Sequence, residues 1–179
     1  MIKKFLISLI LLFLIFDVMA ISRAESSPPK NKQTILGLYI TAKEAYNNWK
    51  DMDEKPFILD VRTPEEYFFV GHAPISRNIP VRLLNQKQAY KKMKPVLEMN
   101  PSFITEVKKL FKDTDTIFIM CRSGSRSALA VNLLARTGFN KVYNIIDGFE
   151  GDPVRDPESY FYGKRAKNGW KNSGAPWTY

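Results

Sequence analysis

Cys121 is the only cysteine in the 179-residue chain, and it directly follows an apolar run at residues 116–120. It opens a loop of serines, a glycine and two arginines, Arg122 and Arg126, which leads into residues with helical spacing. In such a turn, backbone N–H groups and the positive end of the helix surround the sulfur with hydrogen-bond donors. The two arginines add positive charge, which favours the thiolate over the thiol. The sequence therefore predicts a nucleophilic cysteine in an anion-binding cradle.

The alternative for Cys121 is a small buried side chain without a chemical role, which is what most free cysteines are. Two nearby arginines argue against it, because each buried charge would need a partner of its own. The helix after the loop is well supported, since Leu129 and Leu133 share a helical face and Gly138 is placed to end it. These features favour a reactive cysteine between a strand and a helix.

Four segments of the chain, taken in order, resemble the signatures of the rhodanese-like domains. That family carries sulfur as a cysteine persulfide on a loop between a central strand and a helix. Besides the cysteine loop, the matching segments are ILDVRTPEEY at 58–67, GHAPISRNIP at 71–80 and VYNIIDGF at 142–149. The resemblance covers about residues 35–150 and implies a single rhodanese-like domain there.

Alternating strand and helix patterns independently predict an α/β fold with a mostly parallel central sheet and helices on both faces. The expected strands are at 57–61, around 78–79, at 116–120 and at 142–145. A capping box at Thr41 and Glu44 predicts a helix through about Lys50. The lysine-rich stretch 83–101 has helical potential around 86–93 and leads to a helix at about 102–111.

Cysteine phosphatases place a thiolate and an arginine around a helix N-terminus in a similar way, so their chemistry has to be compared. In their loop the arginine is the sixth residue after the cysteine, and it wraps a phosphoryl group. Here the sixth residue is Ser127, and Arg126 is the fifth. A loop shorter by one residue suits a single sulfane sulfur atom better, and it resembles the sulfurtransferase branch.

The resemblance implies a role for the whole loop. Cys121 would attack the outer sulfur of a small anionic donor such as thiosulfate, and hold that sulfur as a persulfide until a thiol, or cyanide, removes it. The expected substrate-binding residues are Arg122, Ser123, Gly124, Ser125, Arg126 and Ser127. The acceptor thiol is expected on a small molecule or a redox protein. No cofactor is expected, and one cysteine with one histidine exclude a conventional structural zinc site.

Asp60 and Arg62 end an apolar strand, where open α/β sheets gather their functional groups. We expect both to support the loop through hydrogen bonds or an ion pair, rather than to take part in catalysis. The alternative for this segment is a helix start, with Thr63 as the cap and Pro64 in the first turn. His72, the only histidine, is expected at the pocket rim or in a structural role.

A second function has to be weighed against sulfur transfer. The same pocket could serve a non-catalytic or redox-sensing module that binds a sulfur anion or a partner protein. The intact Cys121 with both arginines argues against it, because rhodanese-like modules that only bind often lack the cysteine. The physiological donor and acceptor are not specified by the sequence.

The N-terminus has the pattern of an export signal. Lys3 and Lys4 precede twelve uninterrupted apolar or small residues, 5–16. This run is too short to span a bilayer, which takes about 20 apolar residues. We therefore expect residues 1–24 to be a signal peptide, cleaved after Ala20 or Ala24, and the mature protein to be exported, to the periplasm, without stable membrane insertion.

Two further segments flank the expected domain. Residues 25–34 have the composition of a flexible leader, and residues 151–179 form an extension rich in aromatic side chains that is expected to pack on the domain. A partner-binding flap is the alternative for the extension. The net charge of +9 favours anionic partners, but the lysine clusters are expected to be solvated helix faces, and no nucleic-acid partner is expected.

Overall fold

Five short strands form the central sheet of the computed structural model, which describes residues 27–179. β6 (Ile117–Met120) lies at its centre, and all four residues of β6 are buried, as expected for a strand covered on both faces. Every neighbouring pair is parallel, in the order β1 (Tyr39–Ile40), β7 (Val142–Ile145), β6, β2 (Phe57–Asp60) and β3 (Ser76–Asn78). The predicted fold class is confirmed. The predicted signal peptide, residues 1–24, lies outside the described residues.

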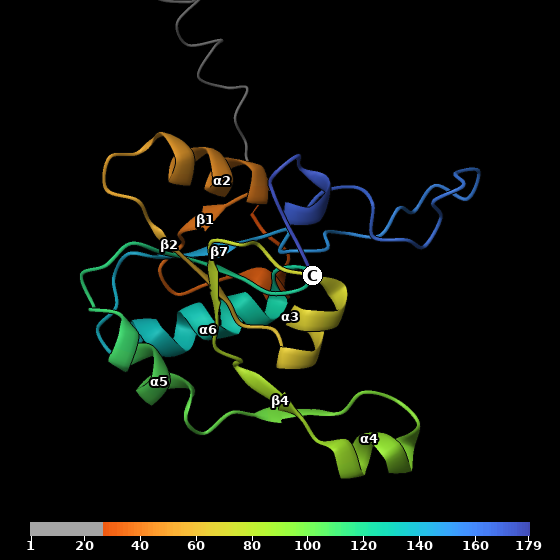
Figure 1. Cartoon of the computed structure of the whole chain (residues 1–179), viewed down its shortest axis with the longest axis horizontal. Coiled ribbons are helices and arrows are strands. Elements are labelled where there is room, and N and C mark those ends of the chain that lie inside the picture. The colour runs from red at the N-terminus through yellow and green to blue at the C-terminus, as the bar shows by residue number, and fades with distance from the viewer. Residues whose placement is uncertain (1–26) are drawn as a thin grey trace, which may run out of the picture.

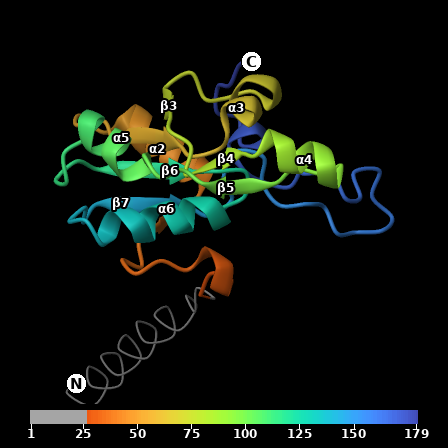
Figure 2. The ribbon, with the colours of Figure 1, turned by 90° about the horizontal axis from the view of Figure 1, so that it is seen from below.

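Helices cover the sheet on both faces (Figure 2). One apolar cluster joins β2 and β6 to α5 (Phe103–Leu110) and α6 (Ser125–Ala135). The cluster on the other face contains residues of α2 (Ala42–Asp51) and packs against the end of α3 (Pro64–Val70). Because both clusters include residues of β6, the carboxyl end of this strand, where Cys121 lies, is held by packing from both sides.

Capping boxes start two of the helices. In α2, the Thr41 side chain accepts from the Glu44 N–H, and the Glu44 carboxylate accepts from the Thr41 N–H. Thr63 and Glu66 repeat this arrangement in α3. The helix start considered for the segment after Arg62 is therefore confirmed, and it places Glu66 in the first turn of α3.

A small arm extends from the sheet layers (Figure 1). It consists of β4 (Arg82–Leu84), α4 (Gln86–Lys92) and β5 (Leu97–Met99), and its two strands pair antiparallel. The helical potential near residues 86–93 is confirmed. The two strands were not predicted, because three residues each give too short a pattern to distinguish from a loop.

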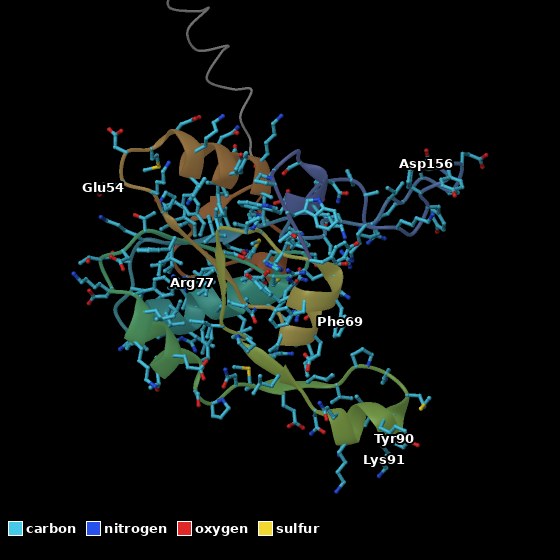
Figure 3. The ribbon with its side chains drawn as sticks, in the orientation of Figure 1. Glu54, Phe69, Arg77, Tyr90, Lys91 and Asp156 are labelled. Atoms are coloured by element: carbon cyan, nitrogen blue, oxygen red, sulfur yellow. The ribbon has the colours of Figure 1, made fainter. Side chains whose placement is uncertain are left out.

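Beyond residue 150, the chain leaves the sheet and returns to it. Residues around Asp156 lie far from the domain, at the tip of a loop (Figures 1 and 3). The 3-10 helix η2 (Trp170–Asn172) then brings Trp170, which is 0% exposed, into the second apolar cluster. Farther on, the backbones of His72 and Thr178 exchange two hydrogen bonds. No helix within residues 27–179 is long and apolar enough to cross a membrane.

Candidate functional site

Cys121 lies between β6 and α6, at the mouth of the loop that the sequence singled out. Its side chain is nearly enclosed, with 1% of the residue exposed. The sulfur accepts a hydrogen bond from the Gly124 N–H over 3.2 Å, and the Ser127 hydroxyl oxygen lies 3.4 Å from it. α6 begins at Ser125, so the positive end of this helix faces the sulfur as well. This environment can stabilise a negative sulfur atom.

Two glycines allow the loop to fold this tightly. Gly124 has a φ of 98° and Gly148 a φ of 64°, in the region that side chains rarely adopt. A Cβ on Gly124 would lie 2.2 Å from the Ile146 carbonyl oxygen, and one on Gly148 would lie 2.4 Å from the Cys121 carbonyl oxygen. The Phe149 N–H donates to that same Cys121 oxygen over 2.7 Å. The segment after β7 is therefore the support on which the loop rests.

Asn144, on β7, orients Ser127 and was not singled out in the sequence. Its amide nitrogen donates to the carbonyl oxygens of Lys32 and Gly124, so its oxygen is left to accept from Ser127, over 2.6 Å. A hydroxyl has one hydrogen, which this short bond uses, and the Ser127 oxygen then presents lone pairs to the sulfur. A thiol on Cys121 can donate to that oxygen, whereas a thiolate relies on the Gly124 N–H. An Asn within an otherwise apolar strand was the signal that could have indicated this role, because a buried amide needs hydrogen-bond partners.

The two loop arginines occupy different environments. Arg122 is exposed, and within residues 27–179 its side chain makes no hydrogen bond or ion pair. Arg126 instead forms a two-pronged ion pair with Glu66 of α3, and both N–O distances are 2.6 Å. The sequence predicted that both would bind the donor, and it did not predict a partner for Arg126. Glu66 stood in the ILDVRTPEEY motif without an assigned role.

This ion pair changes the acidity of both partners. Burial raises the pKa of Glu66, but the hydrogen bonds and charge of Arg126, with a hydrogen bond from Thr63, bring that pKa below its ordinary value. Burial likewise lowers the pKa of Arg126, while Glu66 raises it, and the net shift is upward. Both groups are therefore charged at neutral pH, and the ion pair is present there.

Asp60 and Arg62 form a second ion pair, at the carboxyl end of β2. Both residues are 0% exposed, and the closest N–O distance between them is 2.6 Å. The same arginine nitrogen donates to the Gly71 carbonyl, and the guanidinium carbon lies 4.1 Å from the centre of the Phe149 ring. Asp60 and Arg62 were expected to support the cysteine loop, but the side-chain hydrogen bonds that involve them are to each other, to Gly71 and to Asn78. The contacts of this pair join β2, the end of α3 and the segment after β7.

The loop has a hollow on each side. Arg122 and Arg126 line a cleft of about 660 Å³, together with Thr63, Glu65, Glu66, Val70, Glu150 and the arm residues Leu84, Lys94, Pro95 and Leu97. Ser123 and Ser125 line a separate hollow of about 530 Å³, bounded by residues 29–32 and by the C-terminal extension. Of the six residues predicted to bind substrate, both arginines line the larger cleft, Ser123 and Ser125 line the other hollow, and Gly124 and Ser127 line neither.

The described part of the expected leader is bonded to this region. Asn31, in the short helix η1 (Lys30–Lys32), donates to the Ser125 hydroxyl, and Lys32 forms an ion pair with Asp152 over 3.1 Å. Residues 25–34 were expected to be a flexible leader because of their polar composition, whereas Asn31 and Lys32 are held by these contacts. No cluster of three or more potential metal ligands occurs in residues 27–179.

A parallel central sheet with helices on both faces, and a cysteine loop between its middle strand and the helix that follows, define a class of α/β domains. The family model of the rhodanese-like domain matches residues 41–151, and the chain belongs to this family.

Similar proteins agree with this assignment. A crystal structure of Rv0390 from M. tuberculosis has a TM-score of 0.60 and 25% identity, covering 78% of this chain and 95% of that one. The uncharacterized protein RP600 of Rickettsia prowazekii is 32% identical over 78% of this chain and 96% of its own length. Thiosulfate sulfurtransferase 16, chloroplastic, of Arabidopsis thaliana is 37% identical over 51% of this chain and 68% of its own.

Proposed function

We propose that the protein is a sulfurtransferase that moves sulfane sulfur from an anionic donor such as thiosulfate to a thiol or cyanide. The observation that carries the proposal is the environment of Cys121, whose sulfur accepts a backbone N–H at the start of α6. A relative named thiosulfate sulfurtransferase, 37% identical over half of this chain, supports the same chemistry.

The reaction has two displacements. The Cys121 thiolate attacks the outer sulfur of thiosulfate, an S–S bond forms to the protein, and the sulfur–sulfur bond of the donor breaks with release of sulfite. An acceptor thiolate then attacks the terminal sulfur and leaves as a persulfide, which regenerates the Cys121 thiolate. The Gly124 N–H, which donates to the Cys121 sulfur, would stabilise the thiolate that attacks the donor and that is regenerated at the end.

Mass spectrometry tests the proposal directly. Protein incubated with thiosulfate should gain the mass of one sulfur atom, and a thiol or cyanide should remove it. Cys121→Ser should gain nothing, because an alcohol is a far weaker acid than a thiol and forms no persulfide. If the folded wild-type protein gains no sulfur under these conditions, the proposal is wrong.

The low exposure of Cys121, 1%, favours a second candidate, a module that binds a sulfur anion or a partner without turnover. For such a module, thiosulfate would protect the fold against heat through Arg122 and Arg126 without any sulfur being transferred. Calorimetry with and without thiosulfate, run beside the mass measurement, separates the two functions. Aryl phosphate hydrolysis that is lost in Cys121→Ala would instead favour a phosphatase.

We also propose that the protein is exported, on the basis of the charged and apolar pattern of residues 1–24. The intact mass of protein from the cell envelope of its host should place the mature N-terminus near residue 21 or 25. Full-length protein recovered from the cytosol would contradict export. The acceptor would then come from the cytosolic thiol pool.

A further inference from the structure

The Glu66–Arg126 ion pair lines the cleft that also contains Arg122, where the proposed function would place an anionic donor. Cys121 is 1% exposed and is not among the residues that line the cleft, but Arg126 is close enough to interact with its charge. A guanidinium binds a carboxylate and the oxygens of a sulfonate-like group with the same two parallel N–H donors. In the structure, Glu66 already occupies both of those donors on Arg126.

The ion pair is placed so that a ligand can exchange with it. The side chains of Arg126 and Glu66 are 15% and 23% exposed, so an anion in the cleft can reach them. The Glu66 oxygen nearest to Arg126 also accepts from the Thr63 N–H over 3.1 Å. If Arg126 turns to a ligand, Glu66 therefore keeps a hydrogen bond and is not left as an isolated buried charge.

We infer that Glu66 is a built-in competitor of the sulfur donor, a specificity-determining residue that holds Arg126 until an oxyanion replaces its carboxylate. The inference rests on the proposed function and deepens it. When only a fraction of the protein has Arg126 available, the apparent affinity for the donor falls by that fraction. A donor with an oxyanion group can bind Arg126 in place of Glu66 and so regain affinity. A donor without such a group cannot, so the cleft favours donors that carry an oxyanion.

Glu66→Gln is the decisive variant. Glutamine at this position retains an acceptor for the Thr63 N–H and so preserves the capping box, while the competing charge is removed. The KM for thiosulfate should fall about three- to tenfold with little change in kcat, which is the range expected for releasing a partly exposed ion pair. Cysteamine persulfide, a cationic donor without an oxyanion, should show no such gain.

Glu44→Gln is the matched control. Glu44 has the same capping-box position in α2 and is not among the residues that line the cleft. Its replacement removes the same charge and should leave the KM for thiosulfate unchanged. An equal fall of KM in both variants would mean that net charge alone is responsible, and would overturn the inference.

A double-mutant cycle tests whether Glu66 acts on donor binding through Arg126. In an Arg126→Ala background, Glu66→Gln should have no further effect on the KM, because no guanidinium remains to be released. The same improvement with and without Arg126 would contradict competition at this side chain. A higher KM in Glu66→Gln than in wild type would show that Glu66 positions Arg126 for the donor, which is the opposite role.

Persulfide formation by the wild-type protein, measured first by mass, separates this inference from the proposed function. If the wild-type protein takes up sulfur but Glu66→Gln leaves the thiosulfate KM unchanged, competition by Glu66 is wrong and sulfur transfer stands. If the wild-type protein takes up no sulfur, sulfur transfer itself fails. Isothermal titration with sulfite then tests Glu66 alone, with tighter binding expected in Glu66→Gln.

Discussion

Two ion pairs of the same chemical type flank the first turn of α3, and they differ in how deeply they are buried. Asp60 and Arg62 are two residues apart in sequence and both side chains are fully enclosed, whereas Glu66 and Arg126 are partly exposed and 60 residues apart. Each arginine uses two nitrogens on one carboxylate. Arg62 uses Nε and one terminal nitrogen, whereas Arg126 uses its two terminal nitrogens, one on each Glu66 oxygen. The two pairs therefore differ in burial as well as in the donors they use.

We call the enclosed Asp60–Arg62 pair the inner ion pair and the partly exposed Glu66–Arg126 pair the outer ion pair. Opening the inner ion pair costs free energy. The Arg62 side chain also donates to the Gly71 carbonyl, and the Asp60 carboxylate also accepts from the Arg62 backbone N–H, so both side chains hold nearby backbone. An opened pair would leave two charges away from water. The outer ion pair, Glu66–Arg126, lines a cleft, where solvent can reach both partners and an anionic ligand could take the place of Glu66 on Arg126. The same pairing is therefore enclosed in one place and accessible to solvent in the other, as competition between Glu66 and a donor would require.

Arg62→Ala should give the largest effect. It leaves the Asp60 carboxylate buried without its partner, so the free energy of unfolding should fall by about 3 to 5 kcal/mol, measured by urea denaturation. Arg77→Ala on β3 is the control, since Arg77 is exposed. A loss below about 1 kcal/mol for Arg62→Ala would mean that the two ion pairs do not differ as described.

Arg126→Ala should mainly reduce activity. Losing a charged partner of the donor costs about 2 to 4 kcal/mol in the reaction, which is roughly a thirty- to thousandfold fall in kcat/KM for thiosulfate. The free energy of unfolding should change by about 1 kcal/mol or less, because the Glu66 carboxylate stays near solvent. Changes below threefold in both Arg126→Ala and Arg122→Ala would show that neither arginine binds the donor.

The smallest expected effect is a dependence of stability on pH. The pKa of Glu66 in the folded protein lies below its ordinary value of 4.5, so the outer pair stabilises the fold above that pH and loses its contribution as the pH falls through the lower pKa. The free energy of unfolding of the wild-type protein, measured by urea denaturation, should exceed that of Glu66→Gln by about 1 kcal/mol at pH 7. This difference should shrink toward zero as the pH falls and Glu66 is protonated. A difference that is constant from pH 7 to pH 3 would contradict this.

The sequence predicted the features that depend on local patterns. The buried strands at 57–61 and 116–120, the capping box at Thr41 and the loop between strand and helix each occupy a few consecutive residues, and the structure contains all of them. The arginine pair at positions 122 and 126 indicated an anion site through charge alone. Residue types at short spacing were sufficient for these predictions.

Features that depend on distant contacts were missed. Nothing near Arg126 in the sequence indicates that Glu66 is its partner, because sheet topology brings α3 to the loop. Asn144 was likewise hidden within an apolar strand, although its side chain bonds both Gly124 and the segment near Lys32. The polar composition of residues 25–34 also suggested a flexible leader. The contacts of Asn31 and Lys32 could not be predicted from this segment, because their partners, Ser125 and Asp152, lie far away in sequence.

Trp170 makes the boundary of the folding unit different from the boundary of the recognisable family. The family match ends at residue 151, yet this side chain is fully buried and its ring centre lies 5.8 Å from that of Tyr46 in α2. A version of the chain cut after residue 151 would expose the apolar surface of α2 and β6 that this tryptophan covers, and such surfaces favour aggregation. Anyone producing this domain as a separate module would therefore have to include the segment that carries Trp170.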